Sequence, residues 1–485
     1  MAFGDQELPA TPGSDERWSA PPSSQERRRK AAVDRDIWAM AWPAILSFLV
    51  VNVVDVIDVA LVGHLGRQTV AAWGYAAQCV HVVETLVQSV GIGCVALVAR
   101  ATGARDAPRG RRAIAASSFV AGAVAMLGFL LALTIPRTLL GLLDAEPAVI
   151  ELSVPYFRLF AASMVLYGMA FMYESSLRAN RSTRGPMLIA VCVMTVKTVL
   201  SVLLVFGLFG LPRLELVGAG IATLAAHAVG LALYVVVSRL AARDGLLVTF
   251  GWDDVRRMWD VAGEVLWVSL PSMGERLIMS LALLTYFKIL SAYGTAAIAA
   301  YAIGVRLLSF SWAPGLGFAA AASTFVGQAL GASDSQGARR AARGALTQAL
   351  LLTTSVAFVF VFLRAPLANA FTKDAKVAEC LLPFMMMLAI AQPFMASHFT
   401  LGGVLRGAGD TLTPLVGAAV GNWGFRVPLA WLFTRVFGHE LFWVWAALIG
   451  DHVARVAVNG GVFLRGKWAL RVGATVWQRR DVSEA

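Results

Sequence analysis

The stretch PAILSFLVVNVVDVIDVALVGHLG, residues 43–66, sets the fold class of this chain. It is apolar and long enough to cross a hydrocarbon core of roughly 30 Å as one helix. Its Pro43 and Gly66 recur 228 residues later as Pro271 and Gly294. The same offset pairs further positions up to residue 186: Ala71-Ala72 with Ala299-Ala300, Gly103-Ala104 with Gly331-Ala332, Arg111-Arg112 with Arg339-Arg340, Pro155 with Pro383, Leu177-Arg178 with Leu405-Arg406, and Pro186 with Pro414. One structure is therefore expected to occur twice in the chain.

The composition predicts an integral membrane protein. Of the 485 residues, 58% are hydrophobic and 15% are charged, whereas soluble proteins carry about 25% charged residues. We expect an all-α protein with twelve transmembrane helices, at residues 37–62, 73–99, 113–135, 149–177, 186–209, 215–239, 265–291, 298–328, 341–363, 377–404, 414–436 and 441–463. Six spans per half is an even number, so both halves enter the membrane in the same orientation and form parallel repeats.

These spans define the domain organisation. We expect a disordered cytoplasmic tail at 1–36, an N-lobe of six spans at 37–240, a cytoplasmic linker at 241–263, a C-lobe of six spans at 264–468 and a cytoplasmic C-terminal tail at 469–485. A repeated membrane protein of this kind is typical of transporters whose pathway lies between the two halves.

The distribution of basic residues predicts the orientation. With both termini on one side of the membrane, 27 of the 41 Lys and Arg residues fall on that side and 7 on the other. The positive-inside rule then places both termini in the cytoplasm of a multi-pass protein of the inner (plasma) membrane. The same bias explains the net charge of +11 without a nucleic-acid partner.

Two carboxylates in the first span are the most informative charges. Asp55 and Asp58 are three residues apart, which places them on one face of the helix. Two like charges this close in a low dielectric cannot both ionise easily. The pair is therefore a candidate site for taking up a proton or binding a cation, and the alternative is a structural pair with Lys197.

Lys197 lies in the middle of the fifth span, and its repeat counterpart is Phe425. An uncompensated ammonium within the membrane is costly, so Lys197 is expected to pair with Asp58 or Asp55. Protonation of the acids would break that bridge. A coupling role and a static bridge both remain open.

Further charges lie in the second half. Glu275, at the start of the seventh span, is a candidate for attracting a cation, and the alternative is a local pair with Arg276 or Lys288. Asp451 and Arg455 are four residues apart on the twelfth span, so they are expected to form a structural or coupling pair.

Aromatic residues suggest a surface for flat organic cations. Tyr286 and Trp312, with Trp73 and Tyr301, are candidates to line such a cavity, and packing or lipid contact is the alternative for each. The sequence contains no phosphate-binding loop, no nucleophile elbow and no metal-ligand cluster. We therefore expect no enzyme activity, no cofactor and no bound metal, and transport energised by an ion gradient or a partner subunit.

Several motifs resemble those of the multidrug and toxic compound extrusion (MATE) family. The run from Val56 to Gly66 followed by Ala71-Ala72 is similar to the family's first-span signature. Leu405-Arg406-Gly407-Ala408-Gly409-Asp410-Thr411 resembles its tenth-span signature, and the ending Asp451 to Trp468 is also similar. The resemblance covers roughly residues 37–470. It implies two six-helix lobes with a central cleft and multidrug export driven by inward H⁺ or Na⁺.

The resemblance also assigns roles to single residues. Asp58 matches the first-span acid that the family uses for ion coupling, and Thr223 falls where some members place a hydroxyl near that site. Where many relatives have an Asn and an Asp in the fifth span, this chain has Lys197 and Ser201. The tenth-span acid of the NorM-like branch is replaced near Met395, and Glu275 only approximates that branch's seventh-span acid. Because a lysine can take the place of a bound cation, we favour H⁺ over Na⁺ as the coupling ion.

The resulting hypothesis is a monomeric antiporter that exports cationic, amphipathic small molecules by alternating access. A lipid-linked saccharide flippase of the same superfamily is the alternative, although such a protein would have extra spans and a strongly basic cavity. An integral membrane enzyme and a structural protein are weaker alternatives, because the sequence shows no reactive constellation and many charges within the membrane.

Overall fold

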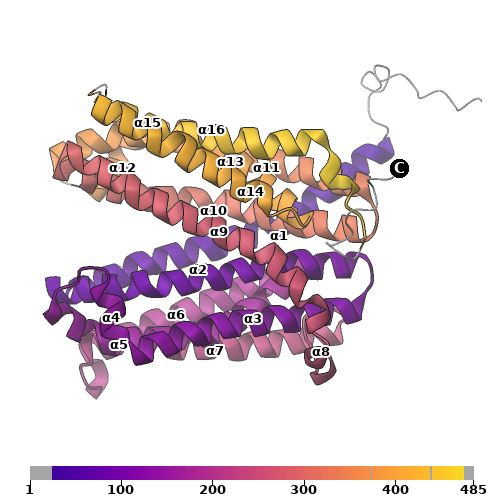
Figure 1. Cartoon of the computed structure of the whole chain (residues 1–485), viewed down its shortest axis with the longest axis horizontal. Coiled ribbons are helices and arrows are strands. Elements are labelled where there is room, and N and C mark those ends of the chain that lie inside the picture. Colours follow the sequence, from indigo (N-terminus) through magenta and orange to yellow (C-terminus); the bar gives the residue numbers. More distant parts are fainter. Residues whose placement is uncertain (1–23, 373, 437, 439, 474–485) are drawn as a thin grey trace, which may run out of the picture.

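The computed structural model describes residues 24–372, 374–436, 438 and 440–473, and these residues form helices and connecting turns without a β-strand (Figure 1). The first half contains α1 (Ser24–Gly63), α2 (Arg67–Gly103), α3 (Ala107–Thr134), α4 (Pro136–Gly141), α5 (Pro147–Ala179), α6 (Arg184–Phe206), η2 (Leu208–Gly210) and α7 (Glu215–Arg243). After α8 (Trp252–Arg256) the second half contains α9 (Trp259–Leu290), η3 (Ser291–Tyr293), α10 (Thr295–Gly331), α11 (Ser335–Phe362), α12 (Arg364–Phe371), α13 (Ala375–Gly407), α14 (Leu412–Ala419), η4 (Val420–Arg426), α15 (Val427–Trp431), η5 (Leu432–Val436), α16 (Leu441–Arg465) and η6 (Lys467–Leu470).

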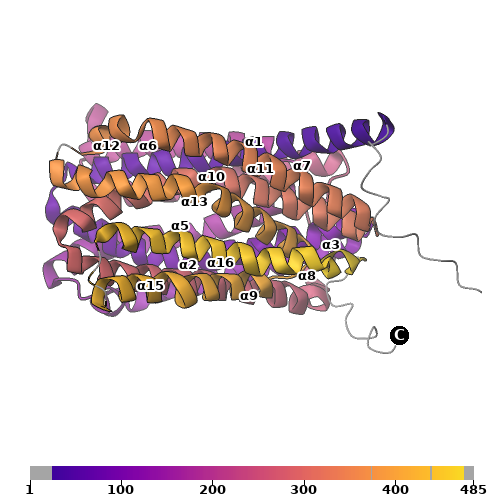
Figure 2. The ribbon, with the colours of Figure 1, turned by 90° about the horizontal axis from the view of Figure 1, so that it is seen from above.

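The helices form two lobes that lie side by side with their long axes nearly parallel (Figures 1 and 2). Helices α2 to α7 build the N-lobe, and α9 to α16 build the C-lobe. The short helix α8 lies at the end of the molecule where α1 begins, and α4 and α12 lie at the opposite end (Figure 1). The segment predicted as a linker therefore contains the end of α7, the helix α8 and the start of α9.

Two predicted boundaries differ from the structure. Helix α1 already begins at Ser24, so residues 24–36, which were expected in a disordered tail, are helical, while residues 1–23 lie outside the described part. The C-terminal segment from 469 is described only to Gly473, and it continues the turn η6 against the C-lobe, where Ala469 is fully buried. The prediction placed the start of the first helix where the apolar residues begin. In the structure α1 begins earlier, because a helix can extend beyond the hydrocarbon core of the membrane.

Eleven helices of the described residues are long and apolar enough to cross a membrane. The predicted eleventh span, 414–436, supplies the twelfth crossing as the succession α14, η4, α15 and η5, in which η4 and η5 are π-helical. Pro428 removes a backbone donor at the start of α15. Single π-turns are frequent at functional sites, and η4 carries the buried polar side chains of Asn422 and Arg426. The fold is thus a twelve-helix, two-lobed membrane protein, as predicted.

Repeat counterparts, residues 228 positions apart, adopt the same local structure. Asp106 caps α3 by accepting from the backbone N–H of Arg109, and its counterpart Asp334 caps α11 by accepting from Gly337. Such caps stabilise helix starts by about 1 kcal/mol. Gly66 and its counterpart Gly294 precede α2 and α10 with φ of 103° and 85°, which favours glycine. The sequence repeat is therefore a structural repeat.

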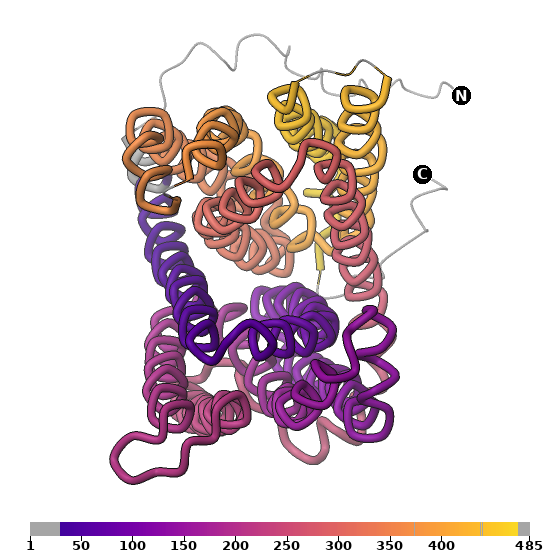
Figure 3. Tube along the Cα trace, turned by 90° about the vertical axis from the view of Figure 1, so that its left-hand side faces the viewer, coloured from indigo at the N-terminus to yellow at the C-terminus, as the bar shows by residue number. Residues whose placement is uncertain are grey.

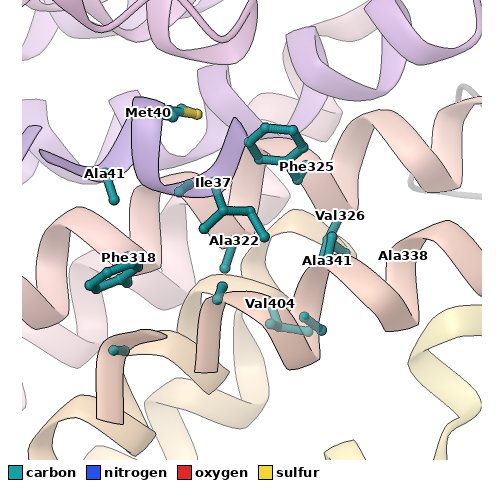
Figure 4. Packing of buried hydrophobic residues seen from close by; sticks show 14 of the residues in the cluster. Ile37, Met40, Ala41, Phe318, Ala322, Phe325, Val326, Ala338, Ala341 and Val404 are labelled. Carbon is teal, nitrogen blue, oxygen red and sulfur yellow. The ribbon is translucent and has the colours of Figure 1, made fainter. Parts of the chain in front are cut away.

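Helix α1 bridges the two lobes. In the end-on view its indigo tube leaves the C-lobe group and reaches the N-lobe group (Figure 3). Its first half packs Ile37 and Ala41 against α10, α11 and α13 in one buried cluster, which includes Phe318 and Val404 (Figure 4). Its last turns bury Val62 in an N-lobe cluster. Much of the first cluster is alanine, because small side chains let helices approach closely within a bilayer.

A second contact between the lobes lies at the ends of α2 and α10. A Cβ added to Gly103 would lie 1.9 Å from the Gln328 carbonyl oxygen, and one added to the counterpart Gly331 would lie 2.1 Å from the Arg100 oxygen. Arg100 donates to the Ala408 oxygen at 2.8 Å, and its counterpart Gln328 donates to the Ala179 oxygen at 2.7 Å. Each lobe therefore binds a helix end of the other, and the lobes are closed together at this end.

Candidate functional site

A small pocket lies in the N-lobe between α1, α2, α5, α6 and α7. Four of the five residues predicted for ion coupling line it: Asp58, Lys197, Ser201 and Thr223. The other lining residues are Leu61, Val62, Trp73, Tyr156, Val205 and Ala219. The structure therefore brings together residues from spans that are far apart in the sequence.

An ion pair occupies this pocket. The Lys197 ammonium donates to Asp58 Oδ2 at 2.5 Å, and the two side chains are 15% and 12% exposed. The sequence left Asp58 and Asp55 open as partners, and the structure forms the bridge with Asp58. Within a membrane such a pair is favourable only when both charges stay together, because either one alone carries a large desolvation cost.

Asp55 lies outside the pocket lining and is exposed. It remains within electrostatic range of Lys197, of Asp58, and of Glu84 on α2 and Arg306 on α10. Asp55 therefore faces charges of both lobes, whereas Asp58 faces the interior of the N-lobe. The spacing of three residues predicts that both acids lie on one face of α1. The rotation of α1 in the structure nevertheless gives the two acids different neighbours.

The ion pair lies near the point where α1 passes between the lobes. One and a half turns before Asp58, the Asn52 side-chain amide donates to the Ser309 oxygen of α10 at 3.3 Å. Further back, Ile37 and Ala41 pack on the C-lobe. A change in the pairing of Asp58 therefore acts on the helix that also holds the other lobe.

The residues predicted for substrate binding do not gather in one cavity. Both carboxylate oxygens of Glu275 accept from Arg406 of α13, at 2.8 and 2.7 Å, so neither predicted local partner is used. Trp312 is half-buried and packs edge-on against Phe399 with ring centroids 6.2 Å apart.

Tyr286 is fully buried and donates to the Val444 oxygen at 2.7 Å. The prediction that it lines a cavity for organic cations is therefore wrong for this conformation, because its hydroxyl and ring are both used within the C-lobe. In the predicted pair on α16, Arg455 Nε donates to Asp451 Oδ1 at 2.6 Å, and both side chains are buried. This local pair forms as the spacing on one helix predicts.

One charged residue of the C-lobe core was not singled out from the sequence. Arg426 donates to the Tyr301 hydroxyl at 2.9 Å and lies over the Tyr286 ring at 4.4 Å from its centroid. The sequence feature that could have identified Arg426 is its position as a charged residue within a largely apolar span. In the part of the chain that the structure describes, no three His, Cys, Asp or Glu side chains are arranged to hold a metal ion.

Two repeated helical lobes that cross a membrane, with a buried ion pair in one of them, have the architecture of a secondary transporter. A family model of the MatE family matches residues 43–203 and 271–432, and the two matches begin 228 residues apart. The chain therefore belongs to the MatE family, and the resemblance found in the sequence is confirmed.

Known relatives match most of this chain, and a solved structure shares its fold. A probable multidrug resistance protein NorM of Thermotoga maritima is 26% identical over 449 residues, which are 91% of this chain and 95% of that protein. An FAD transporter of Shewanella oneidensis is 25% identical over 369 residues, 74% of this chain and 79% of that protein. The crystal structure of the Vibrio cholerae MATE transporter VcmN in the bent form superimposes with a TM-score of 0.81 at 24% identity, covering 91% of this chain and 98% of that chain. This chain is thus a multi-pass membrane transporter for small molecules.

Proposed function

We propose that this transporter is an antiporter that exports amphipathic organic cations and other toxic small molecules in exchange for protons. The observation that carries the proposal is the Lys197–Asp58 ion pair in the N-lobe pocket. The relatives named as multidrug resistance proteins support the substrate class. The lobes would alternate between openings to the two sides of the membrane, and the pathway would lie between them.

The ion pair can couple proton binding to movement. A proton on Asp58 removes the charge that holds the Lys197 ammonium. The ammonium then needs another partner, and the exposed Asp55, one turn away on α1, is within electrostatic range. Because α1 also packs against the C-lobe, a rearrangement of this helix would change the contact between the lobes.

The same pair favours H⁺ over Na⁺. The Lys197 ammonium already sits beside the carboxylate at hydrogen-bond distance. Sodium would have to displace it and find several oxygen ligands, whereas a proton neutralises the carboxylate without needing room.

Orientation and substrate charge follow from the distribution of charges. The 27-to-7 bias of Lys and Arg supports an inner (plasma) membrane protein with both termini in the cytoplasm. In that orientation the closed α2–α10 contact lies on the cytoplasmic side. The acids Asp55 and Glu84 on the N-lobe would attract a cationic substrate. We expect the transporter to work as a monomer, because each chain contains both lobes.

Reconstituted liposomes test this proposal. Purified protein would be given ethidium as a flat organic cation, flavin adenine dinucleotide, or a lipid-linked saccharide, with a pH-sensitive dye inside. We expect proton flux that depends on ethidium and occurs without sodium. Flux that requires sodium would contradict proton coupling. Proton flux that depends on the dinucleotide or the saccharide but not on ethidium would show that this compound, and not an organic cation, represents the substrate class.

A further inference from the structure

The charged and polar residues of the N-lobe pocket have repeat counterparts in the C-lobe that carry different chemistry. The 228-residue repeat maps Asp58 onto Tyr286 and Thr223 onto Asp451. It maps Lys197 onto Phe425, and the next residue is Arg426. In the N-lobe the acid lies on the first helix, whereas in the C-lobe it lies on the sixth. An aromatic residue occupies the first-helix position of the C-lobe, and both lobes carry a cation on the fifth helix.

The C-lobe cation is enclosed more completely than its N-lobe equivalent. Arg426 is 7% exposed, while Tyr286 and Asp451 are fully buried and Tyr301 is 2% exposed. The guanidinium donates to the Tyr301 hydroxyl at 2.9 Å, stacks over the Tyr286 ring at 4.4 Å and lies 4.0 Å from the Asp451 carboxylate. An aromatic face, a phenol oxygen and a carboxylate are the groups that recognise a cation.

The carboxylate in this site is shared by two guanidinium groups. Arg455 binds Asp451 through Nε at 2.6 Å and through a second nitrogen at 3.3 Å. Arg426 therefore adds a second positive charge beside one acid, and the buried group of three carries an excess of one positive charge. Such a charge is retained in a lipid-embedded lobe only where aromatic and polar groups surround it, as Tyr286 and Tyr301 do here.

We propose that Arg426 is a resident cation, a permanent protein-borne occupant of the position where the C-lobe repeat of the ion site would otherwise take up a cation from solution. A guanidinium keeps its charge at every physiological pH and cannot leave the protein. Ion exchange is thereby confined to the N-lobe, and Arg426 determines the specificity of coupling by excluding sodium or potassium from the second lobe. The statement about coupling rests on the proposed function, whereas the occupancy of the site by Arg426 does not.

Chemical rescue tests the occupancy independently of transport. The purified variant Arg426→Ala would be heated in detergent with increasing guanidinium chloride at millimolar concentrations. We expect its Tm to lie below that of the wild type and to rise saturably with guanidinium, by on the order of 2–4 °C. Wild-type protein and the neighbouring variant Phe425→Ala, whose side chain is exposed, should show no such rise.

Two further variants keep the test decisive. Arg426→Gln removes the charge but keeps a hydrogen-bond donor for Tyr301, and it should also respond to guanidinium. Arg426→Lys keeps a fixed cation and should not respond. A Tm that is unmoved by guanidinium in both neutral variants, or moved equally in all proteins, overturns the resident cation. If neither neutral variant folds, a folded Arg426→Lys supports the need for a charge, and its failure to fold contradicts it.

The coupling statement has its own readout. In liposomes without a pH gradient, an imposed sodium gradient should not drive substrate export by the wild type. In Arg426→Ala we expect sodium to stimulate export at least twofold at fixed pH. Sodium-driven export by the wild type, or no sodium effect in a variant that guanidinium does stabilise, would refute the role in specificity while leaving the occupancy in place. Absence of any proton-coupled export would instead refute the proposed function.

Discussion

The substitution Lys197→Ala tests the N-lobe ion pair most directly. It removes the ammonium that binds Asp58 at 2.5 Å in a pocket where the two side chains are 15% and 12% exposed. The two acids of α1 then lie close together without their shared cation, so they hold protons more tightly. We expect export to be impaired and its pH optimum to move upward.

The size of the shift follows from the geometry. At a charge separation of about 4 Å and an effective dielectric constant of about 20, the attraction is about 4 kcal/mol. One pH unit corresponds to about 1.36 kcal/mol, so complete loss of this attraction would move the pH optimum by about 3 units. Water that enters the pocket screens part of the attraction, and we therefore expect a shift of about 1 to 3 units.

The assay is a double-mutant cycle on proton-driven export, measured across pH with Lys197→Ala, Asp58→Asn and the combined variant. Because the two residues act as a unit, the combined variant should be little worse than either single one. Lys288→Ala is the matched control, since it removes an exposed lysine from α9. Additive losses with an unshifted pH optimum would show that the bridge is an ordinary contact between helices.

Three further predictions concern the site, the orientation and the closed end. Asp58→Asn should abolish ion-driven export while the protein still inserts and folds; wild-type transport by the purified variant would make Asp58 structural. A cysteine placed at Thr372, between α12 and α13 within the 366–376 segment, should react with an impermeant reagent from outside intact cells, and reaction only in inverted vesicles would reverse the topology. Gly103→Ala should destabilise the protein by about 1–3 kcal/mol, because its Cβ would lie 1.9 Å from the Gln328 oxygen. A thermal melt compares this variant with Gly74→Ala, whose Cβ meets nothing within 4 Å. Equal Tm values for the two variants would contradict the close packing at Gly103.

Several structural features were readable from local patterns along the chain. The length of apolar runs predicted twelve crossings, and the 228-residue offset predicted the two lobes. The spacing of Asp451 and Arg455 predicted their ion pair, because residues four apart on one helix lie on the same face. Placing Lys197 beside an acid of the first span needed only the cost of an unpaired charge in the membrane.

Other features depend on how distant helices rotate and cross. The choice of Asp58 over Asp55 joins residues 139 positions apart, and the Glu275–Arg406 pair joins residues 131 positions apart.

The burial of Tyr286 beneath the Arg426 guanidinium likewise depends on three helices meeting. The sequence by itself therefore determined the membrane class, the repeat and the pairs within one helix, since hydrophobic length and helical spacing are local properties. Only the tertiary structure decided which charges meet across helices. Those contacts depend on how the helices rotate and pack against one another, and the order of the helices along the sequence does not specify that rotation or packing.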